Sequence, residues 1–229
     1  EDEEALVTIL KYNLEKSGFQ TYAVTDGKKA LEAVRRQTPD LILLDWMLPH
    51  VSGVEICKTI RQDHALRHIP IIMLTARSEE NDKVSALSIG ADDYMTKPFL
   101  MQELLLRVQH LLQRAYRTEL SRTKAAILQL GDRSVDLHDA LVTLPDGTTL
   151  ALTATERTLL RKLAENRGHI VTYDALCEAV WGADYYGYEN SLGVHIRHLR
   201  EKLEPEPGRP RFLQTVRGIG YKLAKEDAR

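Results

Sequence analysis

The sequence of 229 residues predicts an α/β doubly wound parallel sheet in its first half and a smaller α+β domain in its second half. In the first half, short runs of branched apolar residues alternate with segments of helical periodicity, which is typical of a parallel sheet with right-handed crossovers. In the second half, short strands of alternating apolar and polar residues precede helical segments and a final hairpin. Each half is long enough to bury its own core. We therefore expect one domain over 1–114, a polar linker over 115–126 and a second domain over 127–229.

The elements of the first half follow from spacing and from helix-ending residues. Leu6, Leu10 and Leu14 share one helical face, so a helix is predicted over 4–17, closed by Gly18. Further helices are expected over 27–37, 54–62, 80–88 and 100–114, and strands over 20–24, 40–45, 71–76 and 92–97.

Three of the predicted strands end on residues suited to a phosphoryl group. An apolar run ends on Asp45, the next strand ends on Thr75, and the third is followed by Lys97. The carboxyl ends of parallel strands meet at one edge of the sheet, where ligands bind. Glu1 and Asp2 add two carboxylates, and clustered carboxylates favour a divalent cation such as Mg²⁺. Each of these residues alone is more often a turn former or a surface group, so the prediction depends on the whole set.

This order of residues resembles the receiver domain of two-component response regulators. The resemblance implies that Asp45 accepts a phosphoryl group, that Thr75 and Lys97 contact it, and that Tyr94 is an aromatic switch residue. It implies Mg²⁺ ligation by Asp2 and Asp45 directly, by Glu1 through water, and by the backbone carbonyl of Met47. It also implies a cis peptide bond between Lys97 and Pro98.

The resemblance also bears on the start of the sequence. A receiver has a flavodoxin-like sheet with strand order 2-1-3-4-5, in which the first strand is central. Here the opening carboxylates, which would follow that strand, have no apolar strand before them. We therefore expect the sequence to be a fragment that lacks its first strand, and the chain without that strand to be poorly stable.

The predicted helix over 100–114 carries a polar stripe spaced four, three and four residues apart, formed by Glu103, Arg107, His110 and Arg114. From spacing alone this is a solvated face with an internal Glu103–Arg107 pair. One receiver subfamily dimerises through the corresponding face, and resemblance to it implies a dimer contact here. The implied residues are Lys83, Val84, Leu87, Asp92, Asp93, Glu103, Arg107 and Arg114.

Composition limits the partners. A formal net charge of -2 argues against a polyanion-binding surface over the whole protein, so any nucleic-acid surface must be local. Cys57 and Cys177 lie far apart and lack the neighbours of a metal or redox motif, which fits reduced thiols. No apolar run has the length of a membrane span. We expect a cytoplasmic protein with no membrane partner.

The second half predicts strands, three helices and a hairpin. Strands are expected over 128–130, 134–137, 141–144 and 149–152. Thr153 and Glu156 form a capping-box pattern that opens the first helix, and Thr172 can cap the second. The third helix, about 189–203, has a buried seam of Leu192, Ile196, Leu199 and Leu203, with Asn190, Val194, Arg197 and Glu201 on the opposite pole. Residues 212–223 then form a hairpin with Arg217 at its tip.

Two helices, a basic helix and an arginine-tipped hairpin in this order resemble the winged helix-turn-helix domain of the OmpR/PhoB family. The resemblance extends to the wing sequence, Thr215-Val216-Arg217-Gly218. It implies DNA contacts by Asn190, Ser191, Val194, His195, Arg197, His198, Arg200, Thr215 and Arg217, with Arg217 in the minor groove. Which of these arginines read bases and which hold phosphates stays open. Trp181 and Asp184 match a region that contacts RNA polymerase in this family.

The combined interpretation is a phosphorylation-activated DNA-binding transcription regulator, not an enzyme. Its expected partners are a sensor histidine kinase, Mg²⁺, promoter DNA, RNA polymerase and a second copy of the chain. The segment from Asp45 to Pro49, with Trp46 directly after Asp45, is most similar to the same segment in the family members that control the phosphate regulon. This similarity implies that the protein controls a phosphate-starvation regulon.

Two alternatives belong to other classes. A hydrolase of the haloacid-dehalogenase type needs a second acid two residues after Asp45, where Met47 cannot transfer protons. A regulator whose receiver only dimerises is disfavoured by the intact set of Asp45, Thr75 and Lys97.

Overall fold

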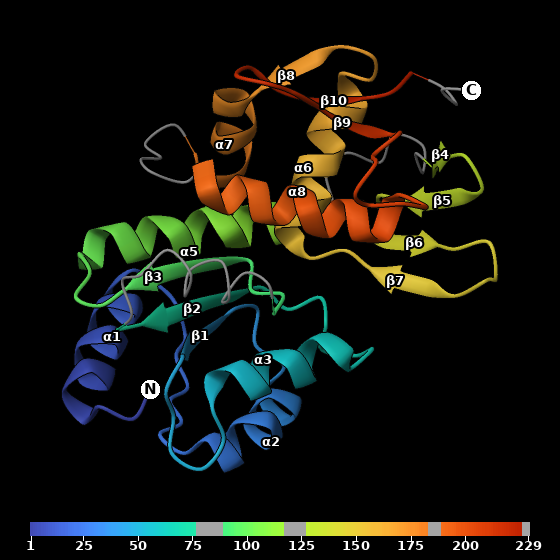
Figure 1. Ribbon diagram of the computed structural model, residues 1–229. Helices are drawn as coiled ribbons and strands as arrows, with labels where there is room; N and C mark the ends of the chain where they lie inside the picture. Colours follow the sequence, from blue (N-terminus) through green and yellow to red (C-terminus); the bar gives the residue numbers. More distant parts are fainter. Residues whose placement is uncertain (77–88, 117–126, 183–188, 226–229) are drawn as a thin grey trace. The chain divides into compact units, whose positions relative to one another are not determined.

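The computed structural model describes residues 1–76, 89–116, 127–182 and 189–225. The chain divides into two compact units, 1–112 and 113–229 (Figure 1). None of the helices in these described ranges is long and apolar enough to cross a membrane.

The N-terminal unit contains a parallel sheet of order β1-β2-β3. Its strands are β1 (Ile42–Asp45), β2 (Ile71–Thr75) and β3 (Asp93–Thr96), and β2 is buried along its whole length. Its helices are α1 (Glu4–Lys16), α2 (Gly27–Gln37), α3 (Gly53–Gln62) and α5 (Met101–Tyr116). Figure 1 shows α2 and α3 on one side of the sheet and α5 on the other. The predicted α/β doubly wound architecture is therefore confirmed.

The strand predicted over 20–24 is wrong. The structure gives this segment no strand pairing, and the N-terminal ammonium of Glu1 donates to the carbonyl of Val24 at 3.3 Å. A strand is stabilised by a ladder of hydrogen bonds to a neighbour, and none of the described strands pairs with this segment. The helix predicted over 80–88 lies outside the described residues. Helix α5 continues through Tyr116, so the first two residues of the predicted linker are helical.

The C-terminal unit begins with a four-stranded antiparallel sheet in sequence order. Its strands are β4 (Ile127–Leu130), β5 (Arg133–Asp136), β6 (Leu141–Thr143) and β7 (Thr149–Ala151). Three helices follow, α6 (Ala154–Glu165), α7 (Tyr173–Trp181) and α8 (Glu189–Leu203). A second sheet of order β8-β10-β9 consists of β8 (Ile170–Thr172), β9 (Leu213–Val216) and β10 (Gly220–Leu223). Strand β8 was not predicted, because it has only three residues and its last residue, Thr172, also caps α7.

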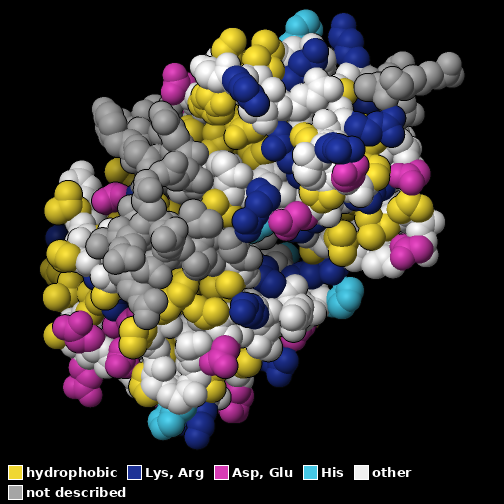
Figure 2. Space-filling model, viewed as in Figure 1, with side chains coloured by type: hydrophobic (Ala, Val, Ile, Leu, Met, Phe, Trp, Pro, Cys, Tyr) yellow, Lys and Arg dark blue, Asp and Glu magenta, His cyan; other side chains and the backbone are white. Residues whose placement is uncertain are grey.

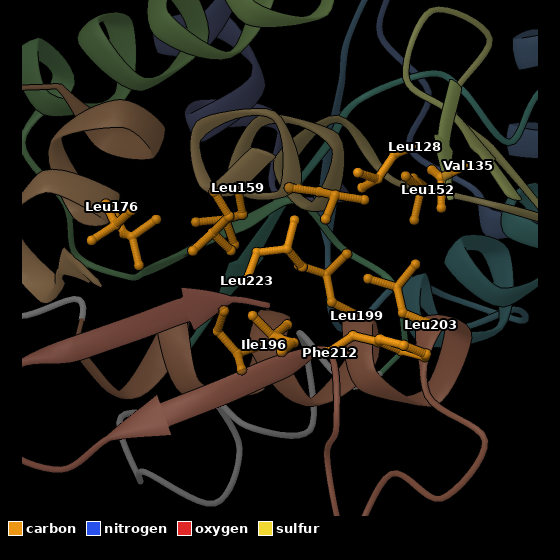
Figure 3. Packing of buried hydrophobic residues seen from close by; sticks show 14 of the residues in the cluster. Leu128, Val135, Leu152, Leu159, Leu176, Ile196, Leu199, Leu203, Phe212 and Leu223 are labelled. Carbon is orange, nitrogen blue, oxygen red and sulfur yellow. The ribbon is translucent and has the colours of Figure 1, made fainter. Parts of the chain in front are cut away.

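The predicted helix caps of this unit are confirmed. Thr153 and Glu156 form the capping box of α6, and the side chain of Thr172 accepts from the N–H of Ala175 at the start of α7. The three helices and the second sheet enclose one apolar core, to which Leu159, Leu176, Ile196, Leu199 and Leu223 contribute (Figure 3). The leucine and isoleucine seam predicted for α8 is thus buried.

Candidate functional sites

The carboxyl edge of the parallel sheet brings together the three predicted strand-end residues. Asp45 ends β1 and is 6% exposed, whereas Thr75 ends β2 and is 1% exposed. Lys97 directly follows β3, and its N–H donates to the carbonyl of Thr75 at 2.7 Å. Because β1, β2 and β3 pair in parallel, their ends lie at the same edge.

Lys97 joins two carboxylates at this edge. Its Nζ lies 2.5 Å from Oδ2 of Asp45 and 2.7 Å from Oε2 of Glu1. Burial lowers the pKa of Lys97, but its hydrogen bonds to Asp45 and Glu1 outweigh burial and raise that pKa above its ordinary value. Burial raises the pKa of Glu1 despite the opposing effect of Lys97. The predicted cis Lys97–Pro98 bond is confirmed.

The acidic residues are spaced closely enough to share a cation. Glu1, Asp2 and Asp45 each offer a carboxylate oxygen, and these oxygens lie within 4.8 Å of one another. Asp2 is exposed, so water has access to the cluster. Mg²⁺ prefers oxygen ligands and keeps several waters when it binds to one or two carboxylates, so this donor set fits that ion.

The segment after Asp45 is fixed by its backbone. The N–H of Met47 donates to Oδ1 of Asp45 at 3.0 Å, while the Met47 side chain is 65% exposed. A Cβ on Gly53 would lie 1.9 Å from the carbonyl oxygen of Asp45. Sequence reasoning treated Gly53 only as a helix start, although a glycine in the first turn of a helix beside a strand-end acid could have signalled this close approach.

The residues predicted as a dimer face are paired within the chain where the structure describes them. Oδ2 of Asp92 lies 2.7 Å from Arg61, and Oδ2 of Asp93 lies 2.9 Å from Arg107. Both carboxylates are buried, and Arg107 also pairs with Glu103 one turn earlier on α5. Lys83, Val84, Leu87 and the side chain of Arg114 lie outside the described residues.

Tyr94, the predicted switch residue, is 7% exposed in β3, where its Cα pairs in register with that of Met73. Strand β2 lies between β3 and the strand that ends on Asp45, and β3 leads directly to Lys97.

Helix α8 is covered more completely than its periodicity predicted. Val194, predicted on the pole opposite the seam, is only 7% exposed. Three other residues that the resemblance implies as DNA contacts are also buried, with exposed fractions of 3% for Ser191, 1% for His195 and 8% for His198. Neighbouring helices explain two of these, because the ring of His195 lies 6.2 Å from that of Trp181 on α7, and Nδ1 of His198 lies 3.9 Å from Glu156 on α6. Arg197 is exposed as predicted and pairs with Glu201 at 3.4 Å. The side chain of Asn190, and Asp184, lie outside the described residues.

Arg200 connects α8 to the hairpin. Its guanidinium donates to the carbonyl of Leu213 at 2.8 and 2.9 Å and to the hydroxyl of Thr215 at 2.7 Å. Thr215 and Arg217 on the hairpin are exposed. Lys and Arg side chains are frequent on the face of the C-terminal unit seen in Figure 2.

Glu204 was missed by the sequence analysis. Its carboxylate is 1% exposed and accepts from the backbone N–H groups of Arg211, Phe212 and Leu213 at 2.9, 2.8 and 2.6 Å. Its position in the sequence, directly after Leu203 at the end of α8 and before β9, could have indicated a buried role for this glutamate. Together with Arg200, it fixes the start of β9 to the end of α8.

Comparisons with known proteins match both halves of the chain. A family model described as the response regulator receiver domain matches residues 1–109, and one described as transcriptional regulatory protein, C terminal, matches residues 147–223. The alkaline phosphatase synthesis transcriptional regulatory protein PhoP of Bacillus subtilis is 42% identical over 228 residues, covering 97% of this chain and 94% of PhoP. The sensory transduction protein RegX3 of Mycobacterium tuberculosis is 43% identical over 223 residues, covering 97% of this chain and 96% of RegX3.

Two solved structures cover nearly the whole chain. A mutant of RitR superposes with a TM-score of 0.74 at 25% identity, covering 98% of this chain and 96% of that chain. DrrB of Thermotoga maritima, an OmpR/PhoB homolog, superposes with a TM-score of 0.50 at 29% identity, with the same coverage.

A receiver followed by a winged helix-turn-helix domain defines a DNA-binding response regulator, in which phosphorylation by a kinase partner activates DNA binding and transcription control. The chain belongs to the OmpR/PhoB family of these regulators.

Proposed function

We propose that Asp45 is the phosphoryl acceptor and that a sensor histidine kinase phosphorylates it. The observation that carries this proposal is the pair of hydrogen bonds from Lys97 to Asp45 and Glu1. They hold the positively charged ammonium of Lys97 beside the carboxylate that ends β1. Asp45 attacks the incoming phosphoryl group, so a bond forms between its carboxylate oxygen and phosphorus while the bond to the donor breaks. Lys97 then pairs with the new dianion, and the buried hydroxyl of Thr75 hydrogen-bonds it.

The acidic cluster would hold Mg²⁺ through Asp2, Asp45 and the backbone carbonyl of Met47, with Glu1 as a ligand through water. Bound Mg²⁺ would offset the negative charge of the carboxylates and of the phosphoryl oxygens. The movement of Thr75 toward the phosphoryl group opens space into which Tyr94 turns. This change alters the face formed by β3 and α5.

We propose that the altered face pairs with the same face of a second copy. Leu106 on α5 is 40% exposed beside the buried Asp93–Arg107 pair, which supports a mixed apolar and charged contact. Arg107 of each copy would pair with Asp93 and Glu103 of the other copy in place of its own. This exchange would link the receivers and leave the number of ion pairs unchanged. The proposed dimer face also includes Asp92, Lys83, Val84, Leu87 and Arg114.

We propose that α8 and the hairpin contact DNA through Arg197, Thr215 and Arg217, which are exposed. The less exposed residues of α8 would then support the interface from within the protein; these are Ser191, Val194, His195, His198 and Arg200. Asn190 stays a proposed DNA contact. The region with Trp181 and Asp184 is the proposed contact for RNA polymerase. Because it controls transcription by binding DNA, the protein acts in the cytoplasm and turns over no substrate.

The DNA contacts can be tested with Arg197→Ala, Arg217→Ala and the control Arg209→Ala, which removes an arginine exposed in the loop before β9. Each of the first two variants should weaken promoter binding, by about 1–3 kcal/mol if the arginine reads a base. Loss of a phosphate contact should instead lower the salt dependence by about one ion. Unchanged affinity in both variants would contradict the proposed interface.

The similarity to PhoP supports promoters of phosphate-starvation genes, including alkaline phosphatase genes, as the targets. Genome-wide sequencing of bound DNA in phosphate-limited and phosphate-rich cells tests this proposal. Binding that does not depend on phosphate supply would argue for another regulon.

Asp45 itself is tested by labelling the full chain with acetyl phosphate and Mg²⁺. Asp45→Ala should abolish labelling, whereas Asp40→Ala, which removes an exposed carboxylate before β1, should not. Wild-type labelling of Asp45→Ala would show that the acceptor is another residue.

A further inference from the structure

The loop 46–52 between β1 and α3 is held by one hydrogen bond that closes its ends and by another that joins its middle to α2. The N–H of Gly53 donates to the carbonyl of Trp46 at 3.0 Å, and the N–H of Gly27 on α2 donates to the carbonyl of Pro49 at 3.2 Å. A Cβ on Gly27 would lie 2.0 Å from the carbonyl oxygen of Val51, so the loop lies directly against the start of α2. The position of this loop determines where the backbone of Met47 lies.

His50, near the middle of this loop, has an unfavourable backbone conformation. Its φ is 67°, in the left-handed region that a side chain with a Cβ rarely adopts. Such a conformation persists only where the surrounding structure fixes it, and such residues cluster at functional sites. A glycine would adopt this φ without strain, so the presence of histidine calls for a compensating contact of its side chain.

That contact is with Asp26. Nδ1 of His50 lies 3.0 Å from Oδ1 of Asp26, which is also the N-cap of α2 and accepts from the N–H of Lys28 at 2.9 Å. The backbone N–H of Lys28, followed by His50, lowers the pKa of Asp26, which keeps this carboxylate charged. The pair therefore joins the loop to a helix that is capped and packed against it.

We propose that the Asp26–His50 pair is a latch that holds loop 46–52 in the conformation that binds a divalent cation, and that His50 is a positioning residue for the phosphoryl site. The inference rests on the proposed function, because the latch acts through the backbone of Met47. Outer contacts that orient ligands commonly set metal affinity without touching the metal.

The latch is tested by titrating the full chain with MgCl₂ and following the fluorescence of Trp46, which adjoins Asp45. The response of Asp45→Ala is subtracted, so the remaining signal reports the cation site. His50→Gly introduces a residue that tolerates positive φ and removes the side chain that contacts Asp26. Asp26→Asn introduces a side chain that still caps α2 but carries no charge. Each should raise the Kd for Mg²⁺, His50→Gly by about three- to fivefold, as expected for a partly exposed pair.

Two further variants separate positioning from general stabilisation. The double variant His50→Gly/Asp26→Asn should bind Mg²⁺ no more weakly than His50→Gly alone, because His50→Gly already removes the contact that Asp26→Asn weakens. Arg35→Gln removes a comparable pair, Arg35 with Asp63 at 3.1 Å, between the ends of α2 and α3. It should leave the Kd unchanged.

An unchanged Kd in His50→Gly, additive effects in the double variant, or an equal loss in Arg35→Gln would each overturn the latch while leaving the cation site intact. A wild-type chain without a saturable response to Mg²⁺ would overturn the proposed cation site and the latch together. Thermal unfolding of each variant, followed by circular dichroism, checks that the compared proteins are folded.

Discussion

Glu204 should be essential for the stability of the C-terminal unit, although it contacts neither proposed ligand. Glu204→Ala leaves three backbone donors without their carboxylate, and two of them belong to Phe212 and Leu213, which are 3% and 0% exposed. A buried donor that loses its partner costs about 1–3 kcal/mol, whereas the N–H of the exposed Arg211 can bond to water. Two such donors give an expected loss of about 2–6 kcal/mol in the free energy of unfolding, a large part of a typical domain stability.

Glu204→Gln provides a graded comparison. Its carbonyl oxygen can still accept from Phe212 and Leu213, but its amide N–H₂ faces the N–H of Arg211, so we expect a smaller loss of about 1–2 kcal/mol. Glu206→Ala, which removes an exposed glutamate two residues further on, should change stability by less than about 0.5 kcal/mol.

Urea unfolding followed by tryptophan fluorescence measures these differences. The chain contains two tryptophans, so a Trp46→Phe background leaves Trp181 as the reporter of the C-terminal unit. A loss below about 1 kcal/mol in Glu204→Ala would refute the reasoning, because it would mean that the three N–H groups are satisfied without the carboxylate.

Three further outcomes are expected. Burial lowers the pKa of His198, although the charge of Glu156 opposes this shift. The stability of the folded protein should therefore decrease as the pH falls below 6.5, the ordinary pKa of histidine, and His198→Gln should flatten that part of a stability–pH curve. Burial raises the pKa of Cys57 to about 11, so the folded protein should not react at Cys57 with a thiol reagent at pH 8, and rapid modification would contradict its burial. Gly53→Ala places a Cβ 1.9 Å from the carbonyl of Asp45, so it should cost about 1–3 kcal/mol or more and reduce acetyl phosphate labelling; wild-type labelling and stability would refute the close approach.

The sequence predicted that Asp45, Thr75 and Lys97 meet at one sheet edge, because topology alone brings them together. Apolar runs identify buried parallel strands, and Asp45, Thr75 and Lys97 come after three of them, so the sheet places them at one edge without any knowledge of packing. The predicted strand over 20–24 failed because a strand also depends on a neighbour, which no pattern within the segment can report.

The face of α8 could be predicted only in part. Helical periodicity identified the leucine and isoleucine seam, but it measures burial from the helix's own pattern and takes no account of what packs on the other sides. Trp181 and Glu156 lie on other helices and reach His195 and His198, which a helical wheel treats as exposed. The family resemblance implied a DNA contact for Arg200, whereas its hydrogen bonds to Leu213 and Thr215 depend on where the hairpin returns.

A phosphoryl group on Asp45 should strengthen DNA binding by α8 and the hairpin. The most direct measurement is the Kd of the full chain for a promoter fragment, with and without acetyl phosphate and Mg²⁺, for the wild type and for Asp45→Ala. Phosphorylation should tighten binding of the wild type by about tenfold or more and leave Asp45→Ala unchanged. An equal Kd for the phosphorylated and unphosphorylated wild type, or the same gain in Asp45→Ala, would contradict the account.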